Sequence, residues 1–202
     1  SMMAMKMGKH VYCQKPLTHS VYEARVIGTV AKETGVATQM GNQGQASEHA
    51  RLICEFRQSG AIGTVREVHA GSNRRPPISP RGIPRPTQTP PPPPELDWDL
   101  WLGPAPARPY HPSYHPFAWR GWWDFGTGVL GDIGCHQLSA VFKALKPGHP
   151  TSIEACSSNY QVGPEIANET ALKSSITRWQ FPPANDRAAF TITWWDGGLM
   201  PP

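Results

Sequence analysis

The chain has 202 residues, of which 39% are hydrophobic and 17% are charged, and its formal net charge is +4. This composition supports a packed core and argues against general disorder. Lysine and arginine are scattered along the sequence, so a nucleic-acid-binding surface is not expected. No apolar run approaches the ~20 residues that a membrane-spanning helix needs.

The first 60 residues alternate between helix and strand patterns. We expect a helix at residues 1–7, a short buried strand at 10–13, a helix at 20–34 and a strand at 36–40. A further helix is expected at 47–58, and glycines follow the three helices as stop signals. This rhythm is typical of a parallel α/β sheet. Because the first helix begins at residue 1 without a cap, we expect the chain to be a piece cut from a longer protein.

The second half has a different pattern. A strand is predicted at residues 64–71, a helix at 131–145, and strands at 152–158, 171–181 and 188–195, which together indicate a mostly antiparallel sheet. Fifteen of the 23 prolines lie within residues 76–116 and predict an irregular, exposed loop. Within this loop, residues 96–103 could form one helical turn with Trp98 and Trp101 as buried anchors. The fold class is therefore α/β with an α+β second half, and the C-terminus also looks cut.

The cysteines and histidines do not predict a metal site. Cys13, Cys54, Cys135 and Cys156 form no C-x-x-C pair and lack zinc-ligand spacing, so we expect small buried side chains without disulfides. His111 and His115 lie four residues apart, but flanking prolines argue against a helix that would pair them. We expect them to make loop contacts.

The segment Gly126–Gly131 reads GTGVLG and matches the G-x-G-x-x-G dinucleotide fingerprint. That fingerprint follows a hydrophobic strand, whereas Trp122, Trp123 and Asp124 precede this one. Asp132 would also place an anion where a pyrophosphate should bind. We therefore reject the fingerprint interpretation.

Three residues are candidates for catalysis. Asp132 and His136 are four apart on a predicted helix and share one face, where the carboxylate could orient a proton-accepting imidazole. A surface pair would show the same spacing. Lys15 follows a predicted strand, and ligands gather at the carboxyl ends of parallel strands. An exposed loop lysine would occupy the same position.

Two sequence strings carry a family resemblance. KHVYCQKPL (residues 9–17) and WWDFGTGVLGDIGCH (residues 122–136) resemble the E-K-P and G-G-x-x-x-D-x-x-x-H motifs of the Gfo/Idh/MocA oxidoreductases. The chain departs from these motifs at Gln14, which replaces the glutamate, and at Thr127, which replaces a glycine. Gln-Lys-Pro resembles a recurring variant, so we interpret it as the mark of a subfamily.

The resemblance implies a fold, a cofactor and a chemistry. It implies that residues 1–43 are the end of a Rossmann domain and that residues 44–202 are an incomplete substrate and oligomerisation domain. Lys15, Asp132 and His136 would be catalytic, and Gln14, Lys15 and Pro16 would contact the nicotinamide end of NAD or NADP. Further candidates for substrate binding are Arg120, Trp122, Trp123 and Asn42, although the tryptophans could equally be core residues.

The resemblance also implies that the pyrophosphate-binding part of the protein precedes residue 1. We therefore expect the 202-residue chain alone to bind NAD weakly. The complete protein would oxidise a CH–OH group of a sugar, sugar derivative or cyclitol, as a homo-oligomer in the cytoplasm, or in the periplasm or outside the cell. Alternatives are an NAD-dependent glycoside-cleaving relative, a metal-dependent hydrolase using Asp132, His136 and His49, and a non-catalytic sugar-binding or assembly module.

Overall fold

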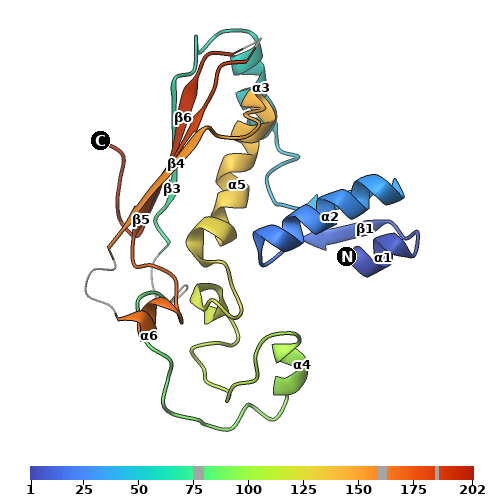
Figure 1. The fold of residues 1–202 in the computed structure, drawn as a ribbon, viewed down its shortest axis with the longest axis vertical. Helices are drawn as coiled ribbons and strands as arrows, with labels where there is room; N and C mark the ends of the chain where they lie inside the picture. Colours follow the sequence, from blue (N-terminus) through green and yellow to red (C-terminus); the bar gives the residue numbers. More distant parts are fainter. Residues whose placement is uncertain (75–79, 159–162, 185–186) are drawn as a thin grey trace.

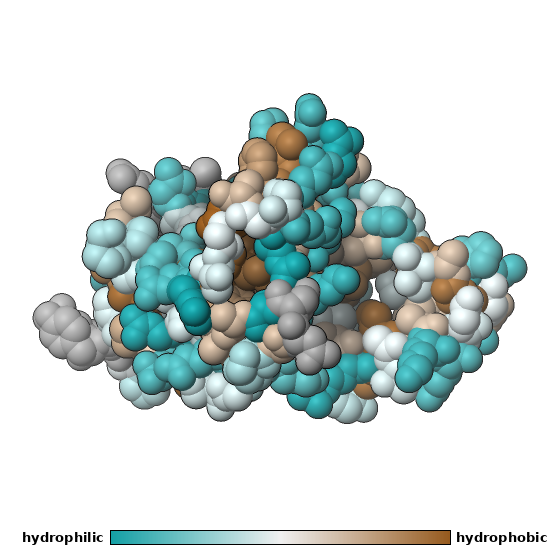
Figure 2. All heavy atoms as spheres, turned by 90° about the horizontal axis from the view of Figure 1, so that it is seen from above, coloured by the Kyte–Doolittle hydropathy of each residue, from teal (hydrophilic) through white to brown (hydrophobic). Residues whose placement is uncertain are grey.

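The fold contains two β-sheets, and one long helix lies beside both of them (Figure 1). The computed structural model describes residues 1–74, 80–158, 163–184 and 187–202. Within these ranges, no helix is both long and apolar enough to span a bilayer. Hydrophilic side chains cover most of the face shown in Figure 2, with hydrophobic ones scattered among them.

The first sheet is small and parallel. Strands β1 (Val11–Gln14) and β2 (Thr38–Gly41) pair with Val11 opposite Thr38, and helices α1 (Met2–Lys6) and α2 (Val21–Thr34) accompany them. Helix α2 begins with a capping box, in which Ser20 and Glu23 bond each other's backbone N–H groups. Its end is set by Gly35, whose φ of 63° suits a residue without a side chain. The helix–strand alternation expected for this part is confirmed.

The second sheet is mixed and has the order β3-β6-β5-β4. Strand β3 (Glu67–Ser72) pairs in parallel with β6 (Phe190–Asp196), whereas β5 (Ser175–Phe181) is antiparallel to both β6 and β4 (Ser152–Ser157). The predicted mostly antiparallel sheet is therefore confirmed. Strand β6 lies between β3 and β5, contacts helix α5 (Gly128–Leu145) and is the most buried strand of the sheet.

Helix α5 (Gly128–Leu145) packs against β3 and β6 and also against α3 (Glu48–Gln58), as the ribbon in Figure 1 shows. The end of α5 contributes to the hydrophobic core, whose buried members are Leu145, Phe181, Phe190 and Ile192. The start of α5 lies beyond this core and contacts the 3₁₀ helix η1 (Ala118–Gly121). The apolar end of α5 thus fixes the helix, and its glycine-rich start is left for other contacts.

The proline-rich loop is irregular in its described part, residues 80–116, apart from α4 (Trp98–Leu102); residues 76–79 lie outside the described ranges. Trp98 and Trp101 stack with ring centroids 4.7 Å apart, but both remain partly exposed. The most buried aromatic side chain of the loop is Tyr114, at 2% exposure, and burial raises its pKa. The predicted helical turn is confirmed, but Tyr114 is a deeper anchor than either tryptophan.

The buried side chain of Arg108 contacts several residues of the same loop and its surroundings. Its side chain is 2% exposed, pairs with Asp124 and Glu169, and lies over the rings of Tyr114 and Phe125. Two carboxylates and two aromatic faces therefore surround a buried guanidinium, which suits its charge and flat shape. This cluster joins the loop to the short helix α6 (Pro164–Ala167), which precedes Glu169.

Two expectations about burial are wrong. Cys54 is buried as expected, but Cys156 is exposed, because β4 is an edge strand with five exposed residues. Strand β1 is only half buried, and Tyr12 is 70% exposed, because its sheet has two strands and helices α1 and α2 cover only part of it. All four cysteines are free thiols.

A buried ion pair fixes the far end of the central strand. Arg81 Nη1 lies 3.4 Å from Asp196 Oδ1 at the end of β6, and both side chains are less than 10% exposed. Asp196 also accepts bonds from Ser175 and from the indole of Trp194. Burial lowers the pKa of Arg81, and Asp196 opposes that shift. The second guanidinium nitrogen of Arg81 donates to Arg74 O at 2.5 Å, which ties the chain after β3 to this pair.

Replacing Arg81 by Met should lower the free energy of unfolding by about 3–5 kcal/mol, because Asp196 would remain as a buried charge without its cation. Urea denaturation of the complete protein measures this. The control is Glu55→Gln, which breaks the exposed Arg51–Glu55 pair of α3 and should change stability by less than ~0.5 kcal/mol. Equal losses in the two variants would contradict the importance given to the Arg81–Asp196 pair.

Candidate functional site

Lys15 and Asp132 form an ion pair between the two halves of the fold. Lys15 follows β1, where its backbone N–H donates to Gly41 O at 3.1 Å, and Asp132 lies in the second turn of α5. Lys15 Nζ lies 2.6 Å from both Asp132 Oδ1 and Asp132 O. The side chains are 16% and 6% exposed. The structure therefore brings together two predicted residues that are 117 positions apart.

Two arginines approach the other oxygen of the same carboxylate. Arg74 Nη1 lies 2.7 Å from Asp132 Oδ2, and Arg120 Nε lies 3.6 Å from it. Arg120 belongs to η1 and also lies over the rings of Phe117 and Trp119. Three cations thus surround one carboxylate.

His136 lies one helical turn after Asp132 on the same face of α5 and is partly buried. Its ring makes no hydrogen bond with any residue in the described ranges, so the expected contact with the Asp132 carboxylate is absent. The two oxygens of this carboxylate already face the cationic side chains of Lys15, Arg74 and Arg120, which make stronger partners than a neutral imidazole. Within the described residues, both ring nitrogens of His136 are therefore without a partner.

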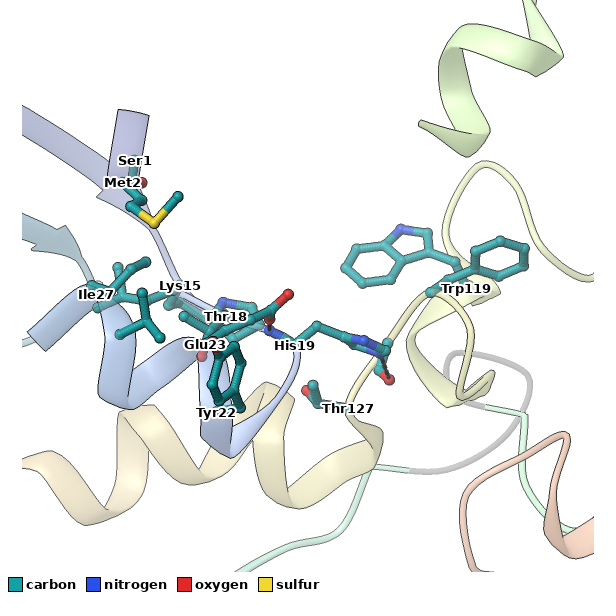
Figure 3. Close-up of a pocket in the computed structure, with 15 residues that line it drawn as sticks. Ser1, Met2, Lys15, Thr18, His19, Tyr22, Glu23, Ile27, Trp119 and Thr127 are labelled. Atoms are coloured by element: carbon teal, nitrogen blue, oxygen red, sulfur yellow. Dashed lines mark hydrogen bonds between the residues drawn. The ribbon is translucent and has the colours of Figure 1, made fainter. Parts of the chain in front are cut away.

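Two more polar bonds hold the first sheet against the α5 region. Asn42, just after β2, donates from Nδ2 to Cys135 O at 2.7 Å, while its buried Oδ1 has no partner within the described residues. His19 Nε2 lies 3.1 Å from Gly126 O, as the dashed line in Figure 3 shows. Both bonds lie near the Lys15–Asp132 pair in sequence and in space.

A pocket of about 740 Å³ lies beside Lys15. One wall runs from Lys15 to Ile27 and the other is formed by Trp119 and residues 125–127, and Figure 3 shows the His19 side chain reaching between them. Pro16 lines this pocket, whereas the Gln14 amide lies against Gly41 instead. Asp132 and His136 are not among the lining residues, so Lys15 alone joins the pair to this cleft.

A second cavity of about 870 Å³ lies at the carboxyl end of β3. Arg74 lines it together with Ile133 and Gln137 of α5, and Trp195 and His69 form its far side, where the indole N–H of Trp195 meets His69 Nδ1 at 3.1 Å. The Asp132 cluster therefore lies between two cavities. Lys15 borders one of them, and Arg74 borders the other.

The predicted tryptophan contacts divide into two cases. Trp122 has no exposed surface and donates its indole N–H to Ser113 O, so its ring is a core element and cannot stack on a ligand in this structure. Trp123 is 36% exposed and donates to Ala167 O. Of the predicted substrate contacts, Arg120 and Asn42 lie at the Asp132 cluster, and the two tryptophans do not.

The fingerprint-like segment Gly126–Gly131 does not follow a strand. It follows η1 and enters α5 at Gly128, whose φ is 64°. At Gly131 a Cβ atom would collide with the Thr127 side chain, so the glycine allows a tight helix start. These features agree with the rejection of a dinucleotide fingerprint here.

The donor groups at the site do not resemble a metal centre. Among the described residues, no three His, Cys, Asp or Glu side chains form a group that could hold an ion. The Asp132 carboxylate is already surrounded by cations, which would repel a metal ion. His111 bonds Ser113 at 2.8 Å, and His115 packs edge-on to Trp101, so these two make the expected loop contacts.

Sequence reasoning missed Arg74 and His19. Arg74 follows the carboxyl end of β3, a position that could have marked it in the way that Lys15 was marked. His19 directly precedes the helix cap Ser20, and nothing in its spacing indicates a partner 107 residues away. Both contacts depend on the tertiary fold.

The comparisons with known proteins agree with this architecture. Residues 85–162 match the Gfo/Idh/MocA family described as an oxidoreductase family, C-terminal alpha/beta domain, and this stretch is less than half of the chain. A search of curated proteins gave no match.

Solved structures with a similar fold include oxidoreductases. They include the WlbA dehydrogenase from Bordetella pertussis with NADH and UDP-GlcNAcA (14% identity, TM-score 0.59, 95% of this chain and 46% of that chain). An NAD-binding oxidoreductase from Klebsiella pneumoniae has 21% identity and a TM-score of 0.58, over 98% of this chain and 45% of its own. GenD2 from gentamicin A biosynthesis, with NAD, has 16% identity and a TM-score of 0.56, over 99% and 44%.

These comparisons establish the fold and the resemblance to oxidoreductases. The chain spans less than half the length of the structures it matches. The motif residues Asp132 and His136 lie within the stretch that matches the family, and Lys15 lies outside it.

The Cys135 thiol provides a probe of this cluster. Burial raises its pKa, the Lys15 charge lowers it and the Asp132 charge raises it. Because only the thiolate is alkylated, Asp132→Asn should speed the reaction of Cys135 with iodoacetamide at least about twofold, and Lys15→Met should slow it. Peptide mass spectrometry measures the rates in the complete protein. Cys156, exposed on β4, is the control and should react equally in all variants; rate changes of the same sign in both variants would contradict the charge assignment.

Proposed function

We propose that the chain is part of a Gfo/Idh/MocA-type, NAD(P)-dependent oxidoreductase that oxidises a CH–OH group of a sugar, sugar derivative or cyclitol. The observation that carries the proposal is the ion pair of Lys15 with Asp132, which joins the two motif regions at 2.6 Å. Residues 1–43 would belong to the cofactor domain and residues 44–202 to the substrate domain.

The proposed chemistry uses three side chains of this chain. Lys15 would donate a hydrogen bond from Nζ to the reacting hydroxyl oxygen and stabilise the negative charge that develops there. His136 would accept the hydroxyl proton on a ring nitrogen that no described residue occupies. Asp132 would act as a positioning residue, because its carboxylate holds the Lys15 ammonium group.

The residues around Lys15 fit the nicotinamide end of the cofactor. The 740 Å³ pocket has aromatic and apolar walls at Trp119, Phe125 and Ile27, which suit a flat ring. Near the same pair, Asn42 Oδ1 is a buried acceptor without a described partner, which suits an amide donor. Nicotinamide, when bound, supplies the acceptor for the hydride.

The proposal extends to the assembled protein. A homo-oligomer is supported by edge strand β4, which exposes five of its six residues, including Ile153 at 61%. We place the enzyme in the cytoplasm, where NAD(P) is available to it as a substrate.

Replacing Lys15 by Met or His136 by Ala should reduce turnover by about 100-fold or more, since each variant loses a group that acts on the reacting oxygen. The assay uses protein expressed from the complete reading frame, follows NAD(P)H formation by absorbance, and screens sugars, sugar acids and cyclitols. His149→Ala is the matched control, because His149 is exposed just after α5. Undiminished turnover in His136→Ala, or no cofactor reduction with any polyol, would count against the proposal.

A further inference from the structure

The charges around Asp132 do not balance. Lys15, Arg74 and Arg120 face this one carboxylate, and their side chains are only 16%, 30% and 20% exposed. Within the described residues, two positive charges therefore remain without an anion in a partly desolvated place. Such an arrangement is costly for the protein on its own and favourable once an anion binds.

The two fully buried arginines of the described chain have carboxylate partners. Arg81 pairs with Asp196, and Arg108 pairs with Asp124 and Glu169. The excess charge at the Asp132 cluster therefore differs from the charge balance at these two buried arginines. In the sequence, the segment 75–79 that follows Arg74 contains no acidic residue that could supply the missing charge.

Arg74 and Arg120 both have N–H groups without a hydrogen-bond partner among the described residues. One N–H of Arg74 bonds Asp132 and its other donors have no partner among the described residues. Arg120 donates from Nη1 to Phe117 O, and its Nε is buried without a hydrogen bond. Because both groups approach Asp132 Oδ2, they lie close enough together to share one bound anion. Arginine forks match the paired oxygens of a carboxylate or phosphate.

The cavity next to Arg74 has the lining that a sugar acid would need. Its volume of about 870 Å³ suits a monosaccharide, and the Trp195 ring gives it an apolar surface. Its polar lining residues are His69, Ser72, Asn73, Arg74 and Gln137. Among the described residues, no Asp or Glu lines it, and Arg74 is the one lysine or arginine that does. The amides can bond hydroxyl groups.

We infer that the complete protein takes a substrate that carries an anionic group, a sugar with a carboxylate or a phosphate. Arg74 and Arg120 bind that group beside Asp132, and the cavity next to Arg74 accommodates part of the sugar. The inference rests on the proposed function for the sugar part of the ligand. The charge imbalance supports the anionic part independently.

The test is isothermal titration of the complete protein without cofactor, using D-glucuronate, D-glucose 6-phosphate and D-glucose. At least one of the two anionic sugars should bind roughly tenfold or more tightly than neutral glucose, and the stronger of the two identifies carboxylate or phosphate as the anion. Equal affinities for all three sugars, or no detectable binding of either anion, would overturn the inference.

Variants then assign the residues. Arg74→Met and Arg120→Met should each remove most of the preference for the anionic sugar, while Arg178→Met, on the exposed side of β5, should keep it. Thermal melting identifies any variant that fails to fold, and the wild-type titrations decide the inference without it. A preference that survives in folded Arg74→Met and Arg120→Met would refute the assignment.

A last titration distinguishes a site for the substrate's anion from a site for the phosphates of the cofactor. The titration with the anionic sugar is repeated on protein saturated with NAD. Unchanged or tighter binding supports a substrate site, whereas loss of binding would show that the phosphates of the cofactor occupy the arginines, which would overturn the inference. Because no arm requires turnover, failed hydride transfer with intact anion binding would refute only the proposed function.

Discussion

The Lys15–Asp132 ion pair is the interaction on which the arrangement of the two sheets depends. Figure 1 shows α1, β1 and α2 standing apart from the large sheet and approaching it beside α5. At that approach the described contacts are polar rather than a broad hydrophobic interface: Lys15 to Asp132, Asn42 to Cys135 O and His19 to Gly126 O. The charges of this pair are 2.6 Å apart and only 16% and 6% exposed, so water weakens the attraction between them less than it would at the surface.

The same pair explains why the catalytic candidates are placed unevenly. The Asp132 carboxylate faces three cations, Lys15, Arg74 and Arg120. It therefore helps to hold the two sheets together in addition to its proposed role in the reaction. His136 is held only by the helix backbone and is left without a described partner. A proton acceptor needs that freedom, whereas a positioning group needs the opposite.

The sequence predicts what local chemistry controls. The capping box of Ser20 and Glu23 and the left-handed Gly35 fix both ends of α2, so that helix is found at its predicted position. Strand ends shift by one to four residues, as at β5, because pairing with neighbours decides where a ladder begins. Burial of Cys156 could not be judged without knowing that β4 is an edge strand. The role of Arg74 could not be predicted from the sequence, because it depends on Lys15 and Arg120, which the fold places beside it.

Three of the four described bonds that join the small sheet to the α5 region end on main-chain carbonyls, Asp132 O, Cys135 O and Gly126 O, and the fourth ends on the Asp132 carboxylate. Every residue type presents the same carbonyl, so substitutions on the accepting side leave these acceptors intact as long as the backbone keeps its path. The donors Lys15, Asn42 and His19 have no such tolerance. In a saturation mutagenesis experiment Asp132 would therefore be the sensitive position on the accepting side, and α5 would look more permissive at Cys135 than its contact with Asn42 suggests.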